Sequence, residues 1–232
     1  MKEVIIRHGG DYLRFDEIDF SIIANDLRSL PFYRDDLFLG MQAMNIGFTD
    51  PNITQLEYDL LETYFEKERT PSFEAMTVGA FSQMWIFSLY EVLRLWRDRK
   101  HDFSKLYKNG GIDLKLKSLV DDNMNITIHD RRKQLKKYRD DQSFRDEVEY
   151  CWIQLEPVYR IVELYRMNMA KHAAPGKSNA IPMATGYGRI NMLCGALDYE
   201  LILDRDSYEL LNRRDVADNL REALLVIRAN KR

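Results

Sequence analysis

The segment "YRMNMAKHAAPG", residues 165–176, contains a pair of side chains whose types and spacing suggest chemistry. Arg166 is followed six positions later by His172, and Pro175-Gly176 then ends the segment. An imidazole exchanges protons near neutral pH, and a planar guanidinium binds phosphate or carboxylate groups through paired donors. Together they would suit proton transfer beside an anionic group.

The same two residues also have a purely structural explanation. His172 could cap the last carbonyls of its helix, where the helix dipole favours a cation, and Arg166 could pair with a surface carboxylate such as Glu163. Positions six apart lie about 120° apart around a regular helix. Arg166 and His172 therefore converge only through the reach of arginine, through distortion of the helix end, or through pairing of two chains in a symmetric dimer.

Residues 142–173 have the clearest helical periodicity of the chain, and they position this pair. Apolar residues alternate at spacings of four and three, as in the seam of a coiled coil. The next seam position is His172, which predicts a histidine directed at a packing partner, and Pro157 predicts a kink or break near Glu156. The seam residues are Phe144, Val148, Cys151, Leu155, Val158, Val162, Tyr165 and Met169.

Residues 72–99 predict a second long helix, antiparallel to the first. One apolar stripe runs from Phe81 to Trp96, and another runs from Phe73 to Phe87. A helix that is apolar on two sides is usually buried, so we expect a central helix here.

The remaining segments complete a mainly α fold, an up-and-down helical bundle with two long central helices and a small C-terminal β-hairpin. A short helix should end near Gly47 and Pro51, and a separate helix should cover residues 52–69. Extended runs around Gly9-Gly10 suggest a first, small hairpin. "ALDYELIL" and "SYELLN" predict the C-terminal hairpin, and an amphipathic helix closes the chain.

We therefore expect a single domain over residues 1–232. Its parts would be an N-terminal helical extension (1–50), a helical core (52–174), and the hairpin with the closing helix (195–232).

Composition excludes several classes of protein. The start has no secretory signal, and no apolar run is long enough to span a membrane. Cys151 and Cys194 lack metal-ligand spacing, and no motif for nucleotide phosphates, serine nucleophiles or zinc is present. We expect a cytoplasmic protein with no metal and no cofactor.

The net charge of −3 hides a basic middle. Residues 94–139 contain 14 Lys and Arg but only 6 Asp and Glu, so their net charge is +8. The remainder of the chain therefore carries −11. Such a region could attract a polyanion such as RNA, with Arg131, Arg132 and Lys133 as the candidate contacts. Alternatively, these residues form ordinary solvated helical faces.

Arg-x5-His late in a core helix of a helical bundle resembles the HEPN superfamily (higher eukaryotes and prokaryotes nucleotide-binding). The resemblance covers residues 72–174. Many members carry a polar residue, often Asn, directly after the Arg; here Met167 follows, and Asn168 comes one place later. The resemblance implies a metal-independent ribonuclease of toxin or phage-defence type, with a composite site across a homodimer.

The resemblance implies the site roles that follow, except that of Glu91, which comes from the expected antiparallel packing of the two long helices. His172 would be the general acid/base, and Arg166 would bind the phosphate and stabilise the charge that develops on it. Asn168 would orient the phosphate or His172, Lys171 would add positive potential, and Glu91 on the other long helix would fix Arg166. The 2′-hydroxyl of RNA would be the nucleophile.

Two other functions remain open. The chain could be a catalytically silent HEPN-like module that binds a nucleotide or a partner protein, or a helical adaptor with no nucleic-acid role.

Overall fold

The computed structural model describes residues 12–120, 124–173, 181 and 186–230 of the chain. A short 3-10 turn, η1 (Phe15–Glu17), precedes seven described helices and a small sheet. The helices are α1 (Ser21–Arg28), α2 (Leu37–Lys67), α3 (Ser72–Lys108), α4 (Ile112–Ser118), α5 (Ile126–Asp140), α6 (Gln142–Lys171) and α7 (Arg213–Ala229). The strands are β1 (Gly188–Ile190), β2 (Leu197–Ile202) and β3 (Tyr208–Leu211).

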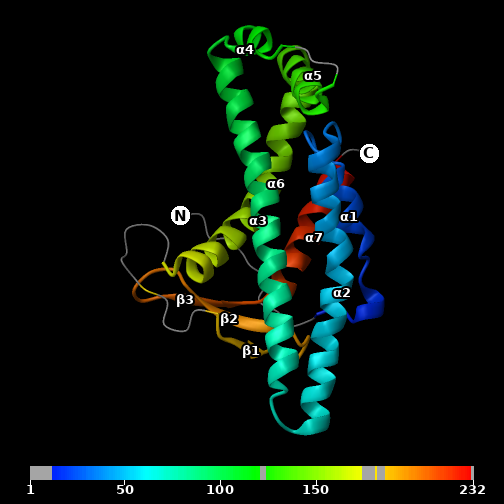
Figure 1. Ribbon diagram of the computed structural model, residues 1–232, viewed down its shortest axis with the longest axis vertical. Coiled ribbons are helices and arrows are strands. Elements are labelled where there is room, and N and C mark those ends of the chain that lie inside the picture. Colours follow the sequence, from blue (N-terminus) through cyan, green and yellow to red (C-terminus); the bar gives the residue numbers. More distant parts are fainter. Residues whose placement is uncertain (1–11, 121–123, 174–180, 182–185, 231–232) are drawn as a thin grey trace.

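Figure 1 shows α2 and α3 side by side as a long antiparallel pair, with α6 crossing α3 and with α7 beside them. The mainly helical class, the long central helices and the C-terminal hairpin are confirmed. β1 adds a third antiparallel strand, so the sheet order is β1-β2-β3. The hairpin expected around Gly9-Gly10 falls mostly on residues 1–11, outside the described part of the chain.

The expected break near Pro51 is wrong, because α2 continues through it as one helix of 31 residues. Proline removes one helical hydrogen bond, but tight contacts of the residues just before Pro51 hold this part of the helix in place. Gly47 lies so close to α1 that a Cβ there would be 2.3 Å from the Ala24 nitrogen. One residue before the proline, Asp50 is fully buried in contact with α7.

α6 is also unbroken through its proline, Pro157, and its C-terminal part turns away from α3 towards the sheet (Figure 1). All eight predicted seam residues, from Phe144 to Met169, are buried. Asp141 begins the helix, since its side chain accepts a hydrogen bond from the Phe144 amide at 3.1 Å. The seam prediction is thus confirmed up to Met169.

The two apolar stripes of α3 have different environments. The first stripe is buried from Trp85 to Trp96, but its first residue, Phe81, is exposed. In the second stripe Phe73, Met76 and Met84 are exposed. The expectation that both sides of α3 are covered is therefore wrong within one chain. An uncovered apolar ridge remains along this helix.

Strand β2 connects the sheet to the helices. Leu197, Tyr199 and Leu201 alternate onto its buried face. Tyr199 meets Tyr165 of α6 edge to face, with ring centroids 6.0 Å apart. The sheet thereby packs on the C-terminal half of α6, close to the segment that carries Arg166.

Candidate functional site

Arg166 projects from α6 onto α3. Its guanidinium carbon lies 4.8 Å from the centroid of the Tyr90 ring, a cation–π contact. Its Nε is 3.9 Å from Glu91 Oε1, and one third of the side chain is exposed. Glu91 is shared, because its Oε2 also accepts hydrogen bonds from Arg94 at 2.8 and 2.6 Å. Arg166 is therefore oriented by α3 but keeps part of its donor fork open to solvent.

His172 lies at the end of α6 and is exposed. It adopts the left-handed conformation, with φ 51° and ψ 43°, while Ala173 closes the helix by donating to the Met167 carbonyl at 3.0 Å. The expectation that His172 faces a packing partner is wrong for the single chain. The helical phase no longer sets its direction, because the last helical residue is Lys171.

Arg166 and His172 are not in direct contact in the described part of the chain. Six residues of α-helix rise about 9 Å, and the described contacts include no hydrogen bond or ion pair between the two side chains.

Asn168 is buried and fully engaged with the sheet. Its Nδ2 donates to the carbonyls of Leu164 and Ile202, both at 3.1 Å, and its Oδ1 accepts from the Ile202 amide at 2.8 Å. These bonds fasten the end of β2 to α6. The Asn168 side chain therefore stabilises the packing of β2 on α6. This differs from the substrate-orienting role implied by the resemblance.

The basic residues of α5 lie far from Arg166. Lys171 is exposed beside His172, but α5 joins the opposite end of α6 (Figure 1), and α6 is about 45 Å long at 1.5 Å per residue. One chain therefore does not bring the two basic regions together.

Two of the three predicted RNA contacts on α5 have internal partners. Arg131 lies 4.5 Å above the Phe103 ring and pairs with Asp102 at 3.5 Å. Burial, followed by the nearby Arg99, lowers the pKa of Arg131 to about 10. Arg132 donates to the carbonyls of Leu116 and Leu119, whereas Lys133 is exposed.

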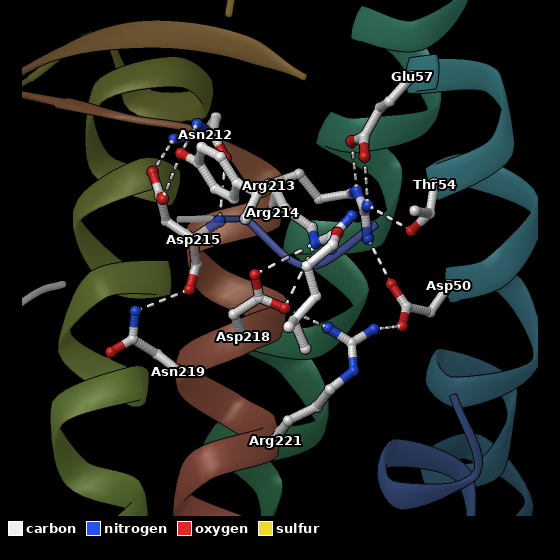
Figure 2. A network of polar contacts seen from close by, with 12 residues as sticks. Asp50, Thr54, Glu57, Asn212, Arg213, Arg214, Asp215, Asp218, Asn219 and Arg221 are labelled. Carbon is white, nitrogen blue, oxygen red and sulfur yellow. Dashed lines mark hydrogen bonds and ion pairs between the residues drawn. The ribbon is translucent and has the colours of Figure 1, made fainter. Parts of the chain in front are cut away.

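The strongest polar cluster was not predicted from the sequence. Figure 2 shows it between α2 and α7. Arg213 Nε and Nη2 donate to the two carboxylate oxygens of Glu57 at 2.7 and 2.6 Å, and Nη2 also donates to Thr54 Oγ1 at 2.9 Å. Its Nη1 donates to Asp50 Oδ1 at 2.5 Å, and Arg221 binds the other oxygen of Asp50. We call these five residues the α2/α7 ion cluster.

The ion cluster is closed to solvent. Asp50, Thr54, Glu57 and Arg213 are each 0% exposed. Burial lowers the pKa of Arg213, but the charges and hydrogen bonds of Glu57 and Asp50 outweigh it and raise the pKa overall. Buried charges paired in this way hold helices together. Arg221 Nε has no partner among the described residues, but it is itself buried, so the cluster offers no accessible group to a substrate.

Asp215 lies beside the cluster without an arginine of its own. Its carboxylate accepts from the Tyr12 hydroxyl at 2.8 Å and from the Asn212 amide at 3.0 Å, which completes the cap of α7. Burial raises the pKa of Asp215 to about 6, although both hydrogen bonds oppose the rise.

Two absences concern the described residues alone. They contain no group of three or more His, Cys, Asp or Glu side chains that could hold a metal ion. None of their helices is long and apolar enough to cross a membrane.

Comparison of the chain with protein-family models, with curated proteins and with solved structures found no match. The HEPN resemblance therefore stays a prediction that depends on Arg166, His172 and the helical core.

Proposed function

We propose that this chain is a metal-independent endoribonuclease of HEPN type, of the toxin or phage-defence kind, whose site is completed by a second copy of the chain. The observation that carries the proposal is the contrast between Arg166, which is one third exposed, and the buried arginines of the α2/α7 ion cluster. The guanidinium of Arg166 lies over the Tyr90 ring, yet part of it stays open to solvent, and an exposed histidine follows six residues later at the helix end.

The chemistry follows from these two groups. Arg166 binds the phosphate that links two nucleotides and stabilises the added negative charge as it reacts. His172 accepts the proton of the 2′-hydroxyl, whose oxygen bonds to phosphorus while the bond to the 5′-oxygen breaks. A second imidazole, His172 of the other copy, donates a proton to the departing 5′-oxygen. The products are a 2′,3′-cyclic phosphate and a 5′-hydroxyl.

A second function is supported by a specific observation. Glu91 partly neutralises Arg166, and Asn168 is fully used by the sheet. Both features fit a catalytically silent module that binds a nucleotide or a partner protein. This alternative predicts binding of RNA or nucleotide without cleavage.

The deciding experiment incubates the purified chain with a fluorescently labelled RNA of mixed sequence in excess EDTA. We expect cleavage products that end in a 2′,3′-cyclic phosphate, and no cleavage of the same RNA with 2′-O-methyl groups throughout. His172→Ala and Arg166→Ala should each reduce cleavage at least 100-fold with little change in melting temperature.

Matched controls come from the same helices. His101→Ala replaces another exposed histidine, on α3, and Arg160→Ala replaces another half-exposed arginine of α6; both should cleave normally. Absence of cleavage by the unmodified chain, or equal loss in the control variants, would contradict the proposal.

A further inference from the structure

A long stretch of the outer side of the α2–α3 pair is unusual because it carries no exposed charge, up to Glu91 at one end. Between Leu37 and Tyr58 the only charged residues are Asp50 and Glu57, and both are buried in the ion cluster. Between Ala75 and Tyr90 there are none. We call the exposed side chains of residues 37–55 and 75–88 the α2/α3 face. Nearly a third of all residues in this chain are charged, so a neutral surface of this length needs a physical explanation.

The α2/α3 face is also strongly apolar. Phe38, Phe48 and Phe81 are exposed by 51%, 55% and 44%. At about 150–250 Å² for a whole aromatic side chain, they present on the order of 300 Å². Met41, Met76 and Met84 are each exposed by more than half and roughly double this area. The total of about 600 Å² lies at the upper end of the largest patch on a typical monomer and approaches the roughly 800 Å² that each partner buries in a stable interface.

The face has relief as well as area. A groove of about 380 Å³ runs between the two helices, lined by Asn45, Thr49, Asn52, Phe81, Met84 and Ser88 among others. A second stretch continues it up α3, lined by Phe87, Ser88 and Glu91. The exposed Phe81 and Met84 at its edge are side chains of the kind that fill such a groove in a partner.

We infer that the α2/α3 face is the surface on which a second copy of this chain docks. A charged partner surface would lose its water against this face and gain no counter-charge. The same face on a second copy carries no charge either. A two-fold axis places such a face against itself, and because both copies of the face are neutral, no like charges repel one another. It also offers Asn, Thr, Gln and Ser side chains to satisfy one another across the contact.

The location of the face connects it to the candidate site. Glu91 lines the upper part of the groove and also pairs with Arg166. Docking through this face would therefore place the second copy on the groove whose upper end, at Glu91, adjoins Arg166. The docking surface does not depend on RNA cleavage; only its use in completing the site rests on the proposed function.

The test measures the mass of the full chain in solution by light scattering and by sedimentation over a range of concentrations. We expect a dimer, and we expect Met84→Lys and Phe48→Glu to weaken it at least 100-fold, because each would bury an unpaired charge. Met84 lies on α3 and Phe48 on α2, and both are more than half exposed, so unchanged circular dichroism should show that the variants fold.

The matched control is Ile153→Lys. Ile153 lies on α6 and is 63% exposed, the same fraction as Met84. It should remain dimeric. A wild-type chain that is monomeric at about 100 μM, or charge variants that dimerise as tightly as Ile153→Lys, would overturn the inference. In that case we would expect the α2/α3 face to bind a different protein.

The cleavage assay keeps the two proposals apart. Wild-type dimers that Met84→Lys dissociates, but that cut no RNA, uphold the docking surface and contradict the ribonuclease. Cleavage by a chain that stays monomeric contradicts the docking surface and leaves the Arg166 and His172 assignment standing without a composite site.

Discussion

Arginine is used in two different ways in this molecule. Arg213, in the α2/α7 ion cluster, is fully buried, and two carboxylates and a hydroxyl occupy its donors. Arg166, near the end of α6, is partly exposed and shares a single carboxylate at 3.9 Å. The first arrangement is complete within one chain, and the second is not. Complete pairing identifies a structural charge, whereas an oriented but incompletely paired charge beside solvent identifies a candidate binding group.

The largest expected effect comes from Arg213→Met. This change leaves Asp50 and Glu57 buried without their main cation, which should lower the free energy of unfolding by about 3–5 kcal/mol. Urea denaturation followed by circular dichroism measures it. Arg160→Met is the control, because its exposed pair with Glu156 should contribute less than about 0.5 kcal/mol.

A combined variant sharpens this result. Adding Glu57→Gln to Arg213→Met removes the stranded carboxylate, while Asp50 keeps Arg221, so part of the lost stability should return. If Arg213→Met alone lowered the free energy of unfolding by less than about 1 kcal/mol, Arg213 would not be the structural charge that its burial indicates. The contrast between Arg213 and Arg166 would then fail.

The sequence predicts the helical core far better than it predicts this cluster. The seam of α6 could be recognised because all its contacts repeat locally, at spacings of three and four. The ion cluster joins residues 50–57 to residues 213–221, and no local pattern encodes that pairing. A signal was present nonetheless, since Asp50, Thr54 and Glu57 lie on the same helical face as the buried Ile46, Ile53 and Leu60. Acids within an apolar face need buried partners.

The candidate site was predicted only in part, for a related reason. The spacing of Arg166 and His172 is visible in the sequence, and Glu91 was inferred from the antiparallel helices. The direction of His172 was not predictable, because the left-handed residue at the helix end breaks the periodicity. The engagement of Asn168 with Ile202 depends on where the sheet packs, which the sequence does not reveal.

Asn168→Ala tests whether the end of α6 contains structural as well as candidate functional residues. The change removes the side chain that binds the part-buried amide and carbonyl of Ile202, so it should cost about 1–3 kcal/mol of unfolding free energy. Thermal denaturation and cleavage are measured together, with Arg166→Ala as the comparison. Full stability combined with lost cleavage would instead assign Asn168 to the candidate site.

The smallest effect concerns Asp215, which is buried like Asp50 but has no arginine partner. Its pKa is about 6 in the folded chain and near 3.9 in an unfolded one. A raised carboxyl pKa means that the folded state binds the extra proton. The stability linked to this proton is present below about pH 4 and is lost as the pH rises through 6.

From pH 7 to pH 5 this carboxyl should therefore stabilise the fold by about 1 kcal/mol. Asp215→Asn should remove that pH dependence. The unfolding free energy of the wild-type chain minus that of the variant should therefore change between pH 5, 6 and 7. Other carboxylates titrate equally in both proteins and cancel in the difference between their unfolding free energies. Asp140 is an example: the hydrogen bond and the charge of Arg139 lower its pKa in both. A difference that is constant with pH would mean that Asp215 is ionised in the fold throughout this range. The negative charge of Asp215 would then need a nearby cation to stabilise it. Asp215 would no longer differ from Asp50 as a buried carboxylate without an arginine partner.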